Sequence, residues 1–226
     1  MTRGLKYWVC KAISYFWDLE VESVRSDVSG KLQVRMVNGR LLLDTSNANY
    51  SFGSLHRLFR KVFLLLDLSS LHPSGILLLG LGGGSVVSII RDEYRLSVPV
   101  TAVEKDPEVI RLAHDHFGLG RHPDVEVVCR DAEEFVREDR TSFSLIIVDL
   151  FVGNDVPEPF TGMDFLGNCS RILAPGGTIV LNFICSSEAQ ATRYATLQEN
   201  LNRLSLRYAE HRFFSTNRVL LIRQGM

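Results

Sequence analysis

Residues 76–85 read Ile-Leu-Leu-Leu-Gly-Leu-Gly-Gly-Gly-Ser, and this stretch decides the fold. A short apolar run that ends in clustered glycines predicts a buried strand followed by a tight turn into a helix, here at about 86–92. Glycine lets the backbone turn sharply and come close to a ligand. The helix that follows offers unpaired N–H groups to a carboxylate or a phosphate. The stretch therefore predicts a nucleotide-binding strand, loop and helix.

The spacing of the glycines narrows the kind of ligand. The G-x-G-x-x-G fingerprint of dinucleotide-binding domains needs glycine at position 85, where Ser85 stands. Glycines at Gly80, Gly82 and Gly84 better suit a loop that binds an amino-acid-like tail. The structural alternative is a tight turn in which Ser85 caps the next helix.

The chain after this loop alternates between strands and helices. The elements are predicted at 100–104, 107–117, 125–130, 132–138, 145–149, 163–173, 178–183 and 188–204, with a helix-ending turn at 173–177. Such alternation requires a parallel sheet with helices on both faces. The last two runs, 206–214 and 218–223, have a link too short for a parallel crossover and therefore pair antiparallel. A mostly parallel sheet with an antiparallel C-terminal hairpin is the Rossmann-like fold of class I methyltransferases, whereas nicotinamide-binding domains continue with parallel strands.

The N-terminal part of the chain predicts a small β-module. A helix is expected at 5–17 from its apolar spacing, followed by β runs at 20–26, 31–37 and 40–44. Asn38-Gly39 between the last two runs indicates a hairpin, because both central residues must take positive φ.

A second helix is predicted at 55–66 and leads to the candidate boundary His72-Pro73-Ser74-Gly75. We therefore expect an N-terminal helix and β-hairpin module at 1–50, a connecting helix at 51–75 and a nucleoside-binding Rossmann-like domain at 76–226. His56, Arg57 and Arg60 fall on the connecting helix. Their simplest interpretation is that they form the solvated face of an amphipathic helix. The alternative is that their side chains reach the nucleotide-binding site.

Acidic residues stand where three of the predicted strands end, which is where ligands bind in an open α/β sheet. Glu104, followed by Lys105, is placed to accept hydrogen bonds from both ribose hydroxyls of a nucleoside. Asp131, followed by Ala132, is placed to accept from an adenine amino group. Asp131 with Glu134 also resembles a helix capping box, so both interpretations stay open there.

The fourth strand ends at Asp149, close to where a group would leave the cofactor. Asp149 is a candidate general base or an anchor for a cationic nucleophile. The following loop adds Asp155 as a second catalytic candidate, and a solvated loop residue is its alternative.

The composition excludes several classes of function. The 226 residues are 46% hydrophobic and 23% charged with a net charge of -1, which argues against a general electrostatic grip on nucleic acid or an anionic membrane. The four cysteines stand far apart, without zinc spacing, so no metal site or disulfide framework is expected and a reducing cytoplasm fits best. Neither a signal peptide nor a membrane span is expected.

Taken together, the chain resembles the spermidine synthase-like family of S-adenosyl nucleoside-dependent transferases. The resemblance is carried by NGRLLLDTSNANYSFGSLHRLF, ILLLGLGGGS, TAVEKDP, CRDAEEF, LIIVDLF and LAPGGTIVLNF. It implies that a loop comprising Gly80, Gly82, Gly83, Gly84 and Ser85 binds the cofactor tail. It also implies that Glu104 binds the ribose, Asp131 the adenine and Asp149 the reaction centre, and that the protein is a homodimer.

Three departures from the polyamine synthases remove acidic residues. Ser85 stands where those enzymes carry an aspartate, the segment 50–53 replaces a Tyr-His-Glu element, and Leu150 and Phe151 replace hydroxyl residues and a second acid. Loss of an ion pair from a partly buried site costs roughly 2–5 kcal/mol. We therefore expect methyl transfer from S-adenosylmethionine to a small acceptor such as an amine. The alternatives are aminopropyl transfer from decarboxylated S-adenosylmethionine, or a nucleoside-binding scaffold without catalysis.

Overall fold

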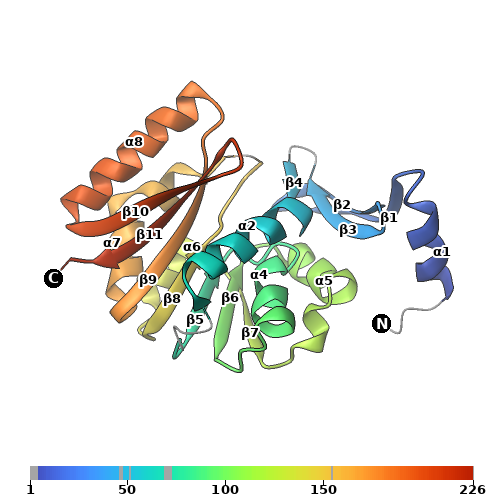
Figure 1. Ribbon diagram of the computed structural model, residues 1–226, viewed down its shortest axis with the longest axis horizontal. Coiled ribbons are helices and arrows are strands. Elements are labelled where there is room, and N and C mark those ends of the chain that lie inside the picture. Colours follow the sequence, from blue (N-terminus) through green and yellow to red (C-terminus); the bar gives the residue numbers. More distant parts are fainter. Residues whose placement is uncertain (1–4, 46–47, 51, 69–72, 154, 226) are drawn as a thin grey trace.

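The computed structural model describes residues 5–45, 48–50, 52–68, 73–153 and 155–225. It contains two sheets, a seven-stranded sheet in the C-terminal part of the chain and a four-stranded sheet near the N-terminus (Figure 1).

The large sheet has the order β10-β11-β9-β8-β5-β6-β7. Its strands are β5 (Ile76–Leu79), β6 (Val100–Glu104), β7 (Val125–Cys129), β8 (Phe143–Val148), β9 (Leu173–Ile184), β10 (Leu206–Phe213) and β11 (Asn217–Gln224). Strands β7, β6, β5, β8 and β9 run parallel, and β11 is antiparallel to both of its neighbours, β9 and β10. The predicted Rossmann-like sheet with an antiparallel C-terminal hairpin is confirmed.

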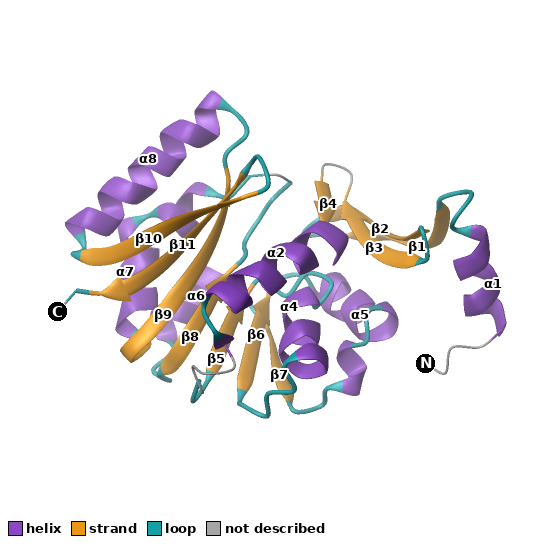
Figure 2. Cartoon of the chain, viewed as in Figure 1, coloured by secondary structure: helices purple, strands orange, loops and turns teal. Residues whose placement is uncertain are grey.

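Helices cover both faces of this sheet (Figure 2). They are α2 (Phe52–Leu65), α4 (Ser85–Ser88), η1 (Ile89–Glu93), α5 (Pro107–His116), η2 (Leu119–Arg121), α6 (Ala132–Glu138), η3 (Glu158–Thr161), α7 (Met163–Arg171) and α8 (Glu188–Arg203). Side chains of a strand point alternately to the two faces. Leu77 and Leu79 of β5 accordingly pack in the cluster of α6, α7 and α8, whereas Ile76 and Leu78 pack in the cluster of α2, α4 and α5.

The helix expected at 86–92 is present, as the short α4 continued by the π-helix η1. Two local details differ from expectation. The N-cap of α4 is Gly84 at φ 75°, not Ser85. The segment 173–177, expected as a turn, belongs to β9. It forms a bulge there, because Phe143 pairs with Leu173 while Leu145 pairs with Thr178.

The N-terminal sheet comprises β1 (Leu19–Ser26), β2 (Gly30–Val37), β3 (Arg40–Thr45) and β4 (Ala48–Tyr50), preceded by α1 (Leu5–Ile13). All its pairings are antiparallel. Asn38 and Gly39 both have positive φ, as the hairpin prediction requires. β4 was not predicted, because it is too short to show an alternating pattern.

This β-module, residues 19–50, packs against α5. Leu32, Val34 and Leu43 form a buried cluster with Val109 and Leu112. Burial of such apolar side chains stabilises the contact by about 1.5–3 kcal/mol each.

A polar contact fixes the position of the β-module. Ser26 Oγ donates to Asp106 Oδ2 over 2.6 Å, and Asp106 also caps α5 by accepting from the Glu108 N–H. Residues 69–72, which include part of the expected boundary, lie outside the described residues. The division at 50 and 75 stays a prediction.

Candidate functional site

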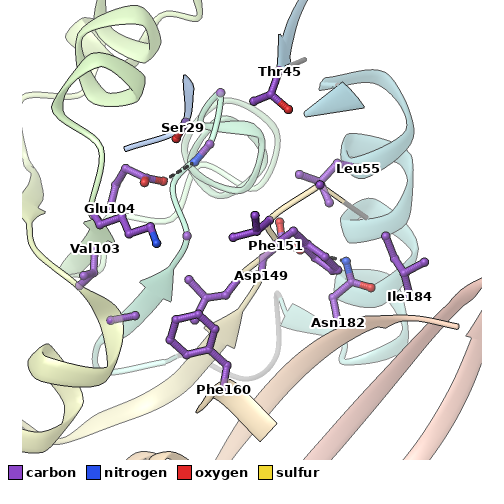
Figure 3. Close-up of a pocket in the computed structure, with 18 of the residues that line it drawn as sticks. Ser29, Thr45, Leu55, Val103, Glu104, Asp149, Phe151, Phe160, Asn182 and Ile184 are labelled. Atoms are coloured by element: carbon purple, nitrogen blue, oxygen red, sulfur yellow. Dashed lines mark hydrogen bonds between the residues drawn. The ribbon is translucent and has the colours of Figure 1, made fainter. Parts of the chain in front are cut away.

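A cavity of about 540 Å³ opens at the carboxyl ends of the parallel strands. This volume lies within the range of small-molecule sites. The ends of β5, β6 and β8 form its floor, and the β1–β2 turn and α2 contribute to its wall (Figure 3). Eight of the predicted site residues line it, namely Gly80, Gly82, Gly83, Glu104, Lys105, Asp131, Ala132 and Asp149.

The glycine loop brings its backbone to the cavity without side chains. Gly80 has φ 94° and Gly82 has φ 50°, a region that L side chains rarely adopt. A Cβ added to Gly80 would collide with the backbone carbonyl of Asp149. Glycine at position 80 therefore allows the ends of β5 and β8 to approach closely, and the loop leaves room for a ligand.

Gly84 and Ser85 do not line the cavity. Gly84 is the N-cap of α4, and Ser85 is buried in the first turn of that helix. The sequence-based choice of Ser85 as the neutral residue facing the ligand is thus not supported by its position. Gly82 and Gly83 face the cavity instead.

Glu104 is held by backbone donors at the end of β6. Its Oε1 accepts from the Asp106 N–H over 3.1 Å, and its Oε2 accepts from the Gly82 N–H over 3.3 Å. Burial raises the pKa of the Glu104 carboxyl, and the two backbone hydrogen bonds oppose that rise. The carboxylate thus joins the glycine loop to the neighbouring strand, and its pKa shows the desolvation typical of functional acids.

Asp131 both caps a helix and lines the cavity, so its position fits the two interpretations that the sequence left open. Its Oδ1 accepts from the Glu133 N–H over 2.8 Å and so caps α6, while the residue also lines the cavity. This bond goes to the second residue of the helix rather than to Glu134, the third, as a capping box requires, and the Glu134 carboxylate lies 3.7 Å from Arg130 in an ion pair.

Asp149 lines the cavity between Glu104 and Asn182 (Figure 3). It is also the end of a chain of side-chain amides. Asn182 Nδ2 donates to Asp149 Oδ1 over 2.9 Å, and Asn217 Nδ2 donates to Asn182 Oδ1 over 3.1 Å. Burial raises the pKa of Asp149 to about 7, and the hydrogen bond from Asn182 opposes that rise. A carboxyl that titrates near neutrality is suited to accept a proton from a substrate.

Asp155 lies outside the cavity lining. Gln190 Nε2 donates to its Oδ1 over 2.6 Å, and Arg193 Nη2 lies 3.1 Å from its Oδ2. The hydrogen bond from Gln190 and the Arg193 guanidinium hold the pKa of Asp155 below its usual value. The predicted catalytic role finds no geometric support, because the carboxylate is occupied in anchoring the loop to α8.

Sequence reasoning missed several residues of the cavity. Asn182 and Asn217 belong to β9 and β11, and the strand-end rule applied to the fifth strand would have found Asn182. Of the three helix residues for which a position at the site was left open, Arg57 lines the cavity, whereas His56 and Arg60 pair with Glu93. The segment 50–53 includes Ser51, which lies outside the described residues.

Within the described ranges, no three His, Cys, Asp or Glu side chains lie together as a metal site would require. In the same part of the chain, every helix is too short or too polar to cross a bilayer.

Comparison with known sequences finds similarity to transferases. Residues 76–177 match a family model described as a methyltransferase domain. The polyamine aminopropyltransferase of Chromobacterium violaceum is 38% identical over 112 residues, which are 49% of this chain and 42% of that protein. The eEF1A lysine and N-terminal methyltransferase of Homo sapiens is 30% identical over 140 residues, which are 57% of this chain and 19% of that protein. The chain thus spans less than half the length of either relative.

Solved structures show the same fold. Spermidine synthase from Thermotoga maritima superposes with a TM-score of 0.69 at 17% identity, covering 90% of this chain and 72% of that chain. Human methyltransferase-like protein 13 in complex with SAH has a TM-score of 0.59 at 24% identity, with 68% and 72% covered. The chain therefore has a spermidine synthase-like class I methyltransferase fold.

Proposed function

We propose that this chain binds an S-adenosyl nucleoside in the cavity and transfers the methyl group of S-adenosylmethionine to a nucleophile at Asp149. One observation carries the proposal. The glycine loop, Glu104, Asp131 and Asp149 come from four successive strand ends and line a single cavity. This is the arrangement that open α/β sheets use to hold a nucleoside along their carboxyl edge.

The residues present fit this ligand. Glu104 is positioned as an acceptor for ribose hydroxyls, and it would take their hydrogen bonds on the carboxylate that Gly82 and Asp106 already orient. Asp131 keeps a second oxygen for an adenine amino group while its Oδ1 caps α6. The bare backbone at Gly82 and Gly83 leaves room for the amino-acid tail.

Asp149 supplies the base in this proposal. When bound, S-adenosylmethionine would supply a sulfonium methyl group, and the electron pair of its broken C–S bond would stay on sulfur. The lone pair of the acceptor oxygen or nitrogen forms the new bond to carbon, and the acceptor proton passes to the Asp149 carboxylate. Asn182 holds Oδ1 of that carboxylate, so Oδ2 is the oxygen left for the acceptor.

The charge of the cavity favours methyl over aminopropyl transfer. An aminopropyl group carries an ammonium, which needs a nearby carboxylate when it is desolvated. The loop contributes only Gly80, Gly82 and Gly83 to the lining, so no side chain of the loop offers that charge. Methyl transfer, first expected because Ser85 is neutral, is thus proposed for a different physical reason: the loop residues that line the cavity have no side chains.

Aminopropyl transfer is the second candidate, and the 38% identity to a polyamine aminopropyltransferase favours it. The human relative at 30% identity is named as a lysine and N-terminal methyltransferase of a protein, which supports testing protein amines as acceptors beside small amines.

Calorimetric titration with three nucleosides separates the candidates. S-adenosylmethionine and S-adenosylhomocysteine are expected to bind, and decarboxylated S-adenosylmethionine to bind at least tenfold more weakly. Binding of the decarboxylated compound alone would overturn methyl transfer in favour of aminopropyl transfer. Failure of all three to bind would overturn the nucleoside site itself. Tight nucleoside binding without transfer to amine, thiol or hydroxyl acceptors would favour the scaffold.

A further inference from the structure

The side of the cavity opposite Glu104 has an apolar wall. Figure 3 shows Leu55 and Ile184 on that side, with Asp149 and Phe151 between them and Glu104. Leu55 belongs to α2 and Ile184 ends β9.

Phe214 extends this wall from the β10–β11 turn. Its backbone takes φ 54°, an uncommon conformation for a bulky residue, and such strain gathers at ligand-binding positions. Lys61 Nζ of α2 lies 5.1 Å from the centre of the Phe214 ring, so the turn and the helix are in contact. We refer to Leu55, Ile184, Phe214 and Arg57 as the acceptor wall.

Arg57 gives the acceptor wall an unpaired positive charge. His56 Nε2 and Arg60 Nε on the same helix lie 2.5 and 2.9 Å from the carboxylate oxygens of Glu93. Arg57 forms no hydrogen bond or ion pair with any residue in the described part of the chain, and it lines the cavity. A guanidinium in this position is available for a ligand carboxylate.

The local charge balance disfavours a cationic acceptor. Among the described residues that line the cavity, the acids are Glu104, Asp131 and Asp149, and the first two lie at the ends of β6 and β7. Of these three acids, only Asp149 remains on the side of the acceptor wall, to which Arg57 contributes a positive charge and against whose Phe214 Lys61 packs. A polyamine would meet more repulsion than attraction here.

We propose that the acceptor wall binds an organic anion, with an apolar body against Leu55, Ile184 and Phe214, a carboxylate on Arg57, and a hydroxyl or neutral amine at Asp149. This inference rests on the proposed function, because it takes the other side of the cavity to be filled by the nucleoside. It replaces a cationic amine with an anionic molecule as the acceptor class.

The test uses the full chain saturated with S-adenosylhomocysteine, so that only the acceptor side remains open. Three phenols with different charges are titrated by calorimetry: 4-hydroxyphenylacetate, its neutral amide 4-hydroxyphenylacetamide, and the cation tyramine. An ion pair at a partly exposed site corresponds to a preference of about tenfold. The acetate is therefore expected to bind about tenfold more tightly than the amide, and tyramine more weakly than both.

Variants of α2 assign the preference to one residue. Arg57→Gln is expected to abolish the preference for the acetate, and Arg57→Glu to reverse it toward tyramine. Arg60→Gln, on the same helix but paired with Glu93, is the matched control and keeps the wild-type order. Affinity for S-adenosylhomocysteine stays unchanged in all three, which also shows that they fold.

Several results would overturn the proposal: equal binding of the three phenols, tightest binding of tyramine, no binding of any of them, or an acetate preference that survives in Arg57→Gln. In each of these cases intact binding of S-adenosylhomocysteine leaves the proposed function standing. Loss of nucleoside binding in the wild-type chain would overturn both.

Discussion

At the scale of the residue, Glu104 joins the glycine loop to the next strand through its two backbone hydrogen bonds. Ribose hydroxyls would add donors to the same carboxylate, and a hydrogen bond to a charged group contributes about 1.5–3 kcal/mol. Glu104→Ala is therefore expected to weaken S-adenosylhomocysteine binding by about 10- to 100-fold in calorimetry. The control is Glu126→Ala, an exposed acid on β7 that bonds to Thr101. Equal affinities of the two variants would remove Glu104 from the nucleoside site.

The pKa of Asp149 makes stability depend on pH. Because burial raises this pKa from 3.8 to about 7, the folded chain holds a proton that the unfolded chain releases at lower pH. The contribution of the protonated carboxyl is full below pH 4 and is lost as the pH rises through 7. Asp149→Asn removes this loss, so between pH 5 and pH 8 the variant should gain about 2 kcal/mol of unfolding free energy relative to wild type.

Urea unfolding of both proteins at the two pH values measures this difference. A constant difference between wild type and Asp149→Asn would show that the carboxyl titrates normally. The same variant should lose methyl transfer while it keeps nucleoside affinity, because only the base is removed.

The individual site residues show what a sequence can and cannot reveal. Glu104, Asp131 and Asp149 could be predicted to share one cavity because each lies at or just after the end of a strand, and strand ends meet at one edge of the sheet. Asp155 was misjudged because its partners Gln190 and Arg193 lie more than thirty residues away, at separations of 35 and 38. Contacts at such distances depend on packing that no local pattern contains.

At the scale of the element, the loop after β5 depends on Gly80. A Cβ there would meet the Asp149 carbonyl, and φ 94° is unfavourable for alanine as well. Gly80→Ala is expected to cost at least 2 kcal/mol of unfolding free energy and to abolish nucleoside binding, because strain adds to a steric overlap.

Gly176→Ala is the matched control for this change. Gly176 also has positive φ, at 76°, but nothing lies within 4 Å of an added Cβ. Gly176→Ala should therefore lose only the unfolding free energy that alanine costs at positive φ, about 1 kcal/mol, as measured by urea unfolding. Similar losses in the two variants would show that the approach of β8 to Gly80 is unimportant.

The elements themselves were largely predictable. Alternating and apolar runs located the strands of the large sheet because each strand has to bury one or both faces. The π-helix η1 and the bulge at 173–177 were not predicted, since both arise from the fit between neighbouring elements rather than from local periodicity. β4 is only three residues long and pairs with β3 without a pattern of its own.

At the scale of the whole molecule, Ser26 connects the β-module to the large sheet. Its hydroxyl donates to the buried Asp106 carboxylate and accepts from the Val28 and Ser29 N–H groups. Ser26→Ala leaves these groups without that partner, and we expect a loss of about 1–3 kcal/mol of unfolding free energy. Ser23→Ala, exposed on the same strand, is the control and should change stability by less than about 0.5 kcal/mol. Equal unfolding midpoints would contradict the predicted role of Ser26.

The assembled cavity was beyond the sequence for a related reason. Arg57 and Phe214 come from segments more than 150 residues apart, at positions 57 and 214, and they share a cavity only because α2 and the β10–β11 turn pack together. The sequence indicated the proposed nucleoside side, because successive strand–helix units each bring one residue to a strand end. The proposed acceptor wall is built from segments far apart in the chain and required the structure.

The hydrogen bonds of Asp106 link the cavity to the packing of the β-module. The Asp106 N–H donates to the carboxylate of Glu104, the proposed ribose acceptor, while its own carboxylate accepts from Ser26 of the β-module, so a single residue contacts both. Coupling between docking of the β-module and binding of a nucleoside would be reciprocal. If docking of the module increases nucleoside affinity by some factor, the nucleoside stabilises the docked module by the same factor. Under the proposed function, nucleoside binding would thus be coupled to the docking of the N-terminal sheet, whose residues Val28, Ser29 and Thr45 also line the cavity.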